Sequence, residues 1–324
     1  MKRRRLVYSV SGWSIGLAFI LDLLLADPPS WPHPVRSIGG AIDRLVKAAG
    51  RFAVTPRLRR LAGAFITVIV VGGTWALVET FLAGLEQFSS FLARAAEVWL
   101  AYTVLAARGL HDQTWRVALA LAENDLPRAR RLLGLVVGRD THDLSRAGII
   151  RALLETLAEN LSDGVVAPLF YLALGGPGLA LAYKAINTLD SMIGYKEEPF
   201  RDLGWASART DDLANFIPAR ISAALIALAA LILKLDMIQA FKTWWREGGR
   251  HTSPNAGRPE AALAGALGVQ LGGPSTYRGR LVVKPTIGRP DRPPDLGQVR
   301  KAEAIILTAG AIMLVAVMAW RGLS

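Results

Sequence analysis

Residues 159–186 read ENLSDGVVAPLFYLALGGPGLALAYKAI, and the glycine–proline run at 175–178 decides how this part of the chain can meet a membrane. The run interrupts the apolar segment from Val165 to Ile186 and leaves about nine apolar residues on either side, where a helix needs about 20 to cross the hydrocarbon core. Broken backbone at membrane depth is tolerated where protein or a water-filled cavity covers it. The pattern therefore predicts a re-entrant hairpin that lines a site, with a single kinked span as the alternative.

Other apolar runs with charged flanks predict membrane-spanning helices: Leu6–Leu25, Leu61–Leu77, Phe88–Ala107, Leu213–Leu235 and Ala304–Trp320. The first run shares its basic start with cleaved signal peptides, but Leu24 and Leu25 do not fit the small-residue cleavage pattern. We expect an all-α, polytopic integral membrane protein with about four or five spans. Residues 1–324 would form a single membrane domain.

Four polar segments lie between the apolar runs, at residues 27–60, 108–163, 187–212 and 236–301. Charges of both signs at helical spacing in the second segment predict amphipathic helices that lie outside or against the bilayer. The stretch from Arg278 to Lys301, rich in Pro, Arg and Gly, is expected to be an irregular loop. Functional residues should lie in these segments.

Composition excludes several kinds of site. Hydrophobic residues make up 52% of the chain, and the net charge of +12 flanks clumped apolar runs, which favours a membrane over nucleic acid. The absence of cysteine excludes disulfides, thiolate nucleophiles and Cys-ligated zinc, and four scattered histidines leave little for an all-His metal site. The sequence contains no P-loop, no GxGxxG after a strand, no HExxH and no GxSxG motif.

The run ENLSDG predicts a metal site. Glu159 and Asp163 stand four residues apart, on one face of a helix expected to end at Gly164, and Asn160 adds an amide oxygen. Two carboxylates can hold Mg²⁺ when water and phosphate oxygens complete the shell. A solvated helix end is the alternative, but ionisable groups at the mouth of an apolar hairpin are usually functional.

Beyond the hairpin, NTLDSMIGYK continues the polar pattern. Lys184, Asn187 and Asp190 share roughly one helical face, and Tyr195 and Lys196 follow the turn at Gly194. If the chain folds back, this face meets ENLSDG and offers ammonium groups for a phosphate. The alternative is that Lys184 extends to the membrane interface and pairs with Asp190.

Other polar stretches supply candidate substrate-binding residues, each with a structural alternative. The stretches are DPPSWPHPVRSIGG, GRDT, IPAR and HTSPNAGRPE, and the residues are His33, Arg36, Arg139, Arg220, Ser253 and Asn255. Amide groups at the start of a helix could bind an anion in the last of these stretches. The alternatives are an interfacial anchor, a local ion pair and ordinary helix capping.

Taken in order, the blocks LDLLLADPPSWPHPVRSIG, VGRDT, ETLAENLSDGVVAPLFYLALGGPGLALAYKAINTLDSMIGYK, SARTDDLANFIPAR and SPNAGRPEAALAGALGVQLGGPSTYRG resemble the membrane-bound adenosylcobinamide-phosphate synthase family of cobalamin biosynthesis. The resemblance runs along nearly the whole chain. It implies an ATP-dependent ligase that joins a corrinoid carboxylate of adenosylcobyric acid to the amine of aminopropanol or its phosphate. Activation of a carboxylate by phosphoryl transfer needs Mg²⁺ and cationic groups rather than a protein nucleophile.

For that reaction, the expected metal ligands are Glu159, Asp163 and Asp190, which together with Lys196 are also the expected catalytic residues. The expected substrate-binding residues are His33, Arg36, Arg139, Asn160, Lys184, Asn187, Tyr195, Arg220, Ser253 and Asn255. Mg²⁺ would be the cofactor and ATP a co-substrate. The expected partners are the corrinoid, the amine, the lipid bilayer and other membrane-bound enzymes of the pathway, with no nucleic acid.

The expected location is the inner cell membrane. Basic residues flank the first apolar run on both sides, so the charge bias does not fix the orientation, and the use of ATP would place the active loops in the cytoplasm. The alternative function is that of a non-enzymatic transporter or membrane scaffold, because transporters also build sites from broken helices.

Overall fold

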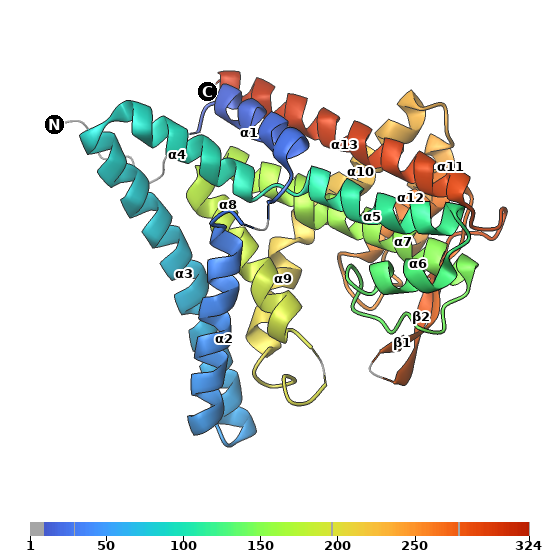
Figure 1. The fold of residues 1–324 in the computed structure, drawn as a ribbon, viewed down its shortest axis with the longest axis horizontal. Helices are drawn as coiled ribbons and strands as arrows, with labels where there is room; N and C mark the ends of the chain where they lie inside the picture. The colour runs from blue at the N-terminus through green and yellow to red at the C-terminus, as the bar shows by residue number, and fades with distance from the viewer. Residues whose placement is uncertain (1–9, 29, 196, 278, 324) are drawn as a thin grey trace. The chain divides into compact units, whose positions relative to one another are not determined.

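The computed structural model describes residues 10–28, 30–195, 197–277 and 279–323 (Figure 1). The chain forms two compact units, each built from more than one segment. The first unit takes in residues 1–106, 167–215 and 314–324, and the second takes in residues 107–166 and 216–313.

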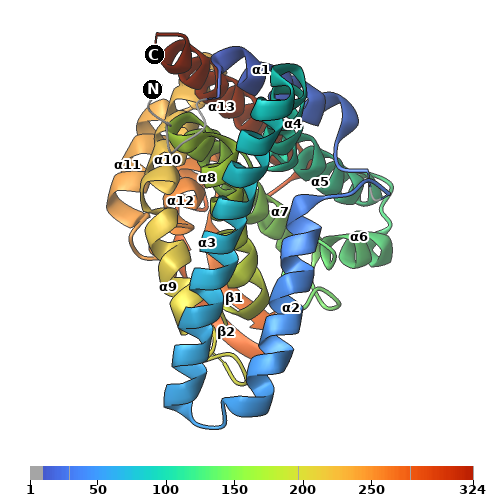
Figure 2. The ribbon, with the colours of Figure 1, turned by 90° about the vertical axis from the view of Figure 1, so that its left-hand side faces the viewer.

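Helices build the first unit, and these are α1 (Gly12–Leu25), α2 (Pro34–Phe52), α3 (Pro56–Phe88), α4 (Ser90–Thr103), α8 (Ala167–Ile193) and α9 (Trp205–Ala214). Figures 1 and 2 both draw α2 and α3 side by side, joined at one end. Their facing side chains, among them Ile38, Ile42 and Ile66, pack with Leu189 of α8 in a buried core. α3 also approaches the segment before α9 closely, because a Cβ atom at Gly63 would lie 1.8 Å from a backbone oxygen of that segment.

The glycine–proline run breaks α8, as predicted. Gly175 and Gly176 have non-helical backbone angles, and Gly176 has the positive φ of 65° that favours glycine. Tyr171 and Tyr183 would be about 18 Å apart along an unbroken helix, yet their rings stack with centroids 4.9 Å apart. Both hydroxyls also reach the end of α9, where they donate to the Ala214 oxygen and to Asn215 Oδ1, each at 2.9 Å. The two halves of α8 therefore lie side by side as a helical hairpin.

The second unit contains α5 (Ala107–Ala122), α6 (Leu126–Leu133), α7 (Arg146–Leu161), a π-helical turn η1 (Ser162–Val166), α10 (Phe216–Ile232), α11 (Met237–Glu247), α12 (Gly257–Leu267) and most of α13 (Leu296–Leu323). Strands β1 (Leu271–Tyr277) and β2 (Arg280–Ile287) form an antiparallel hairpin. The expectation of an irregular loop from Arg278 to Lys301 is thus wrong for residues 280–287, which form β2, and for residues 296–301, which begin α13. Arg278 lies outside the described residues.

By length and composition, four helical runs of the described chain could cross a membrane: Pro56–Phe88, Ser90–Ala122, Arg146–Ile193 and Leu296–Gly322. The second run joins α4 to α5, and the third joins α7 and η1 to the broken α8. The pair Trp205–Ala214 and Phe216–Ile232, bent at Asn215, makes a fifth if it counts as one span. This agrees with the expected number and with an all-α membrane protein carrying one small sheet. Of the first expected span, Leu6–Leu25, the structure describes the 14-residue α1, and residues 6–9 lie outside the described residues.

Candidate functional site

A buried ion pair organises the second unit around α7. Ser145 caps the start of this helix by accepting a hydrogen bond from the Gly148 amide at 3.1 Å. Two turns later, buried Glu155 pairs through Oε2 with the guanidinium of Arg139, and its Oε1 accepts a hydrogen bond from the Gly272 amide at 2.8 Å. Both side chains of the pair are more than nine-tenths buried, at 8% and 5% exposed. One carboxylate therefore links α7, the loop before it and β1.

The loop at residues 138–141 fastens the β-hairpin. Arg139 donates to Ser275 Oγ at 3.3 Å, and the amide of Asp140 donates to the Thr276 oxygen at 2.8 Å. Asp140 Oδ2 in turn accepts a hydrogen bond from the Gly279 amide at 2.7 Å. The sequence allowed an ion pair within GRDT itself, but Arg139 pairs with a glutamate from α7 instead.

Glycine is required where β1 meets this ion pair. Gly272 has a φ of 80°, and a Cβ atom there would lie 2.2 Å from the Pro285 oxygen on β2. The strand register shifts between Leu271 and Gly273, so the bulge turns the Gly272 amide out of the ladder. That amide is the one that binds Glu155.

Further charges gather around the pair, and we call Arg139, Glu155, Glu159, Glu260 and Lys284 the charged cluster. Glu260 on α12 is 3% exposed, and its carboxyl group makes no hydrogen bond to the described residues. Burial raises the pKa of Glu260 well above its ordinary value, and repulsion from Glu155 and Glu159 adds to the effect while Lys284 and Arg139 oppose it. Glu260 is therefore the member of the charged cluster most inclined to hold a proton.

Glu159 is the exposed carboxylate of the charged cluster. It lies within electrostatic range of Lys284, Glu155 and Arg139. The ammonium group of Lys284 is 5.6 Å from the centroid of the Tyr277 ring. Since Glu155 is occupied and Glu260 is buried, Glu159 is the carboxylate of this group that a ligand can reach.

The helix that carries ENLSDG was expected to end at Gly164. It passes instead into the π-helical turn η1. Asn160 is used locally, since its Nδ2 donates to the Thr156 oxygen at 3.0 Å. The hydroxyl of Ser162 is buried without a hydrogen-bond partner, and Asp163 is half-buried. Single π-helical turns inside α-helices occur frequently at functional sites, so the turn supports the choice of this segment.

The predicted Mg²⁺ site rests on two carboxylates. Within the parts of the chain that the structure describes, no group of three or more His, Asp or Glu side chains is arranged to hold a metal ion. Mg²⁺ is commonly held by one or two carboxylates together with water and substrate phosphate oxygens. The carboxylate oxygens of Glu159 and Asp163 suit that cation, while a complete protein cage is not present among these residues.

The other half of the expected site belongs to the first unit, on the second limb of α8. Lys184, Asn187 and Asp190 all lie on this limb and are half-buried. Tyr195 follows it, and its hydroxyl donates to the Ser191 oxygen at 3.1 Å. Lys196 lies outside the described residues.

The loop before α2 holds two more candidates. Arg36 donates to the Trp31 oxygen at 2.8 Å and to Asp27 Oδ1 at 3.3 Å, so its guanidinium fixes the proline-rich loop. His33 Nε2 lies 3.6 Å from the same Asp27 oxygen. Burial lowers the pKa of His33, with Arg36 and Lys184 acting in the same direction and Asp27 opposing them. These contacts hold the loop in shape.

The remaining candidates make local contacts. Arg220 donates to the Phe216 oxygen at 2.6 Å and lies 3.5 Å from the centroid of the Phe216 ring. Ser253 Oγ accepts hydrogen bonds from the amides of Asn255 and Ala256, at 3.3 and 3.2 Å. Asn255 itself is buried. Ser253 thus holds the turn before α12, whose N-cap residue is Ala256.

Sequence reasoning missed Glu155, Glu260 and Lys284. Glu155 stands one turn before Glu159 on the same helix, a spacing that could have marked it. Glu260 lies in the first turn of a helix, where an acidic residue is favourable for the helix dipole and so does not by itself indicate a site. Nothing local marks Lys284, which reaches the charged cluster through strand pairing.

A family model and several known proteins match most of this chain. The family model described as CobD/Cbib protein matches residues 15–306. Cobalamin biosynthesis protein CobD of Klebsiella pneumoniae is 44% identical over 298 residues, 92% of this chain and 93% of the relative. Cobalamin biosynthesis protein CbiB of Salmonella typhimurium is 42% identical over 317 residues, 98% of this chain and 99% of the relative. No solved structure matches. The chain belongs to the CobD/CbiB protein family.

Proposed function

We propose that this protein is an ATP-dependent ligase of cobalamin biosynthesis that joins a corrinoid carboxylate, that of adenosylcobyric acid, to the amine of aminopropanol or its phosphate. Membership of a family whose relatives are named cobalamin biosynthesis proteins supports the pathway. The charged cluster on α7, α12 and the β-hairpin is the observation that carries the chemistry, since it sets an accessible carboxylate beside a lysine and a buried carboxyl.

The reaction couples two steps that need opposite charges. A carboxylate must first accept a phosphoryl group, whose negative oxygens Lys284 is placed to neutralise. The amine arrives as an ammonium ion and must lose a proton before it attacks. A carboxylate that does not hold Mg²⁺ is proposed for the base.

Mg²⁺ would be held by Glu159 and Asp163, whose oxygen ligands suit it, and when bound it would neutralise charge on the ATP phosphates. Asp190 remains a proposed metal ligand and catalytic residue, and Lys184 and Asn187 remain proposed substrate-binding residues. His33, Arg36 and Arg220 also remain proposed substrate-binding residues, although their observed contacts are local. ATP is a cytoplasmic substrate, so we place the charged cluster on the cytoplasmic side of the inner membrane.

The test uses the purified full chain in detergent with adenosylcobyric acid, ATP and aminopropanol with or without its phosphate. Amide product, followed by mass spectrometry, should form in step with ADP release. A transporter or scaffold would release no ADP in step with an amide, and that result would overturn the proposal. Matching runs with the two amines show which one is used.

The metal assignment has its own variants. Glu159→Gln and Asp163→Asn preserve shape but remove charge, so each should lower kcat by at least about tenfold and raise the Mg²⁺ concentration needed. Glu123→Gln is the matched control, because Glu123 forms an exposed pair with Arg128 in the same unit. Unchanged Mg²⁺ titrations in both variants would remove the metal from this segment.

A further inference from the structure

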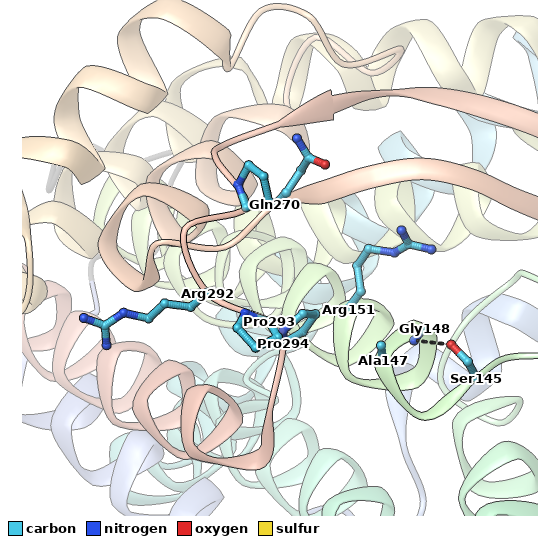
Figure 3. Close-up of a pocket in the computed structure, with 9 residues that line it drawn as sticks. Ser145, Ala147, Gly148, Arg151, Gln270, Arg292, Pro293 and Pro294 are labelled. Carbon is cyan, nitrogen blue, oxygen red and sulfur yellow. Dashed lines mark hydrogen bonds between the residues drawn. The ribbon is translucent and has the colours of Figure 1, made fainter.

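A cavity of about 520 Å³ opens beside the first turns of α7 (Figure 3). Ala147, Gly148 and Arg151 form one wall, Gln270 forms the top, and prolines of the loop after β2 form the remaining wall. Every side chain that lines it is neutral or basic. The cavity lies outside the charged cluster and uses none of its residues.

Two arginines line this cavity, and Arg151 is the one whose side chain is half-buried. Its Nε atom is buried without an acceptor, and the guanidinium makes no ion pair or hydrogen bond with the described residues. Glu155 stands one turn further along α7, but its carboxylate is turned to Arg139 and Gly272. A partly buried cation without a counter-ion is unfavourable, so the site favours an anion.

The arrangement around Arg151 suits a phosphoryl group. The amides of Arg146 and Ala147 belong to the first turn of α7, where the helix offers no carbonyl acceptor, and the positive end of a 16-residue helix faces the same space. Guanidinium groups bind phosphate oxygens through paired, charge-assisted hydrogen bonds. Pro290, Pro293 and Pro294 leave an apolar surface for the rest of the ligand.

We propose that this cavity binds the phosphoryl group of a small phosphorylated ligand, with Arg151 as its principal contact. The site stands on the cavity and its unpaired arginine, and only the assignment of the ligand to the ligase reaction rests on the proposed function. The phosphoryl group can come from free phosphate, a phosphomonoester or a nucleotide, and the probes below separate these sources.

Arg151→Met is the main test. It keeps the apolar stem and removes the guanidinium, which has no partner in the described chain to lose. Calorimetric titration of the full chain in detergent with inorganic phosphate, O-phosphoethanolamine and Mg²⁺-free ATP should show binding of one probe class. The variant should bind that probe roughly ten- to hundred-fold more weakly, the loss expected for one charge-assisted contact.

Two further variants complete the design. Arg292 also lines the cavity, but its side chain is exposed and Figure 3 draws it pointing away from Arg151, so Arg292→Met should leave the affinity within about twofold. Ala147→Glu adds a negative charge to the first turn of α7, which favours the helix but repels an anion, so it should also weaken binding.

Several results would overturn the site. These are absence of binding by all three probes, equal affinities in Arg151→Met and the wild type, or a lower melting temperature of ligand-free Arg151→Met, which would make the arginine structural. If Arg151→Met does not fold, unchanged binding by Ala147→Glu refutes the proposal by itself. A chain that forms no amide yet loses phosphate binding in Arg151→Met would refute the ligase and keep the site.

Discussion

Replacement of Glu155 by glutamine is the most direct test of the charged cluster. The change keeps Oε1, which can still accept the Gly272 hydrogen bond, and removes the charge that balances Arg139. Since both side chains of the pair are more than nine-tenths buried, the variant leaves a buried arginine without a counter-ion. Breaking such a pair costs about 3–5 kcal/mol, whereas an exposed pair is worth about 0–1 kcal/mol.

Thermal unfolding in detergent measures the effect. At roughly 2 °C for each kcal/mol, the lower end of the range for chains of about 150–250 residues, Glu155→Gln should melt about 6–10 °C below the wild type. Glu198→Gln, which removes an exposed pair with Arg59 and Arg201, should change the melting temperature by less than about 2 °C. The double change Glu155→Gln with Arg139→Met should cost much less than the sum of the single changes.

Limited proteolysis can show which part of the chain becomes less stable in Glu155→Gln. Glu155 and Arg139 together hold residues 272 and 275 of β1, so cleavage of the β-hairpin should accelerate in Glu155→Gln before the helices are cut. A melting temperature within about 2 °C of the wild type, or additive single and double changes, would refute the role given to this pair.

The pH dependence of stability should depend on Glu260, because its raised pKa gives a contribution that is complete below the ordinary carboxyl range and lost as pH rises through the folded value. The melting temperature should therefore fall as the pH is raised above that range in the wild type and fall less in Glu260→Gln. A parallel decline in both proteins would contradict the assignment. Gly63→Ala should destabilise by about 1–3 kcal/mol, because its Cβ would meet the Leu203 oxygen at 1.8 Å. Gly72→Ala on the same helix, with no atom within 4 Å, should be neutral or gain up to about 1 kcal/mol; equal effects would refute the packing argument.

The sequence predicted the features that depend on local composition. The break in α8 could be read from GGPG because glycine and proline interrupt helices wherever they occur together in an apolar run. The stacked Tyr171 and Tyr183 rings then show the consequence of that break. The membrane helix near the C-terminus and the general helical content followed from hydropathy in the same way.

Features that depend on contacts between residues far apart in the sequence could not be predicted from it. The segment GGPSTY looks like a turn, yet it becomes β1 because β2 pairs with it and residues 138–140 bind its outer side. Arg139 lies 16 residues before its partner Glu155, and neither position is distinctive in its own window. The expected alignment of Glu159 and Asp163 assumed continuous α-helix, and the π-helical turn changes that geometry.

Three charged residues lie along one face of α7, and each has a different role in the structure or in the proposed sites. Arg151, Glu155 and Glu159 follow one another at intervals of four residues, about 6 Å apart along the helix, while Leu153, Leu154 and Leu157 are fully buried. The middle residue, Glu155, has a structural role, because its carboxylate pairs with Arg139 and accepts a hydrogen bond from the Gly272 amide. We propose the outer two as ligand-binding groups, with Arg151 beside the cavity at the helix start and Glu159 near the π-helical turn. Because one helix carries both, the proposed anion site and the proposed carboxylate ligand lie about 12 Å apart along its axis.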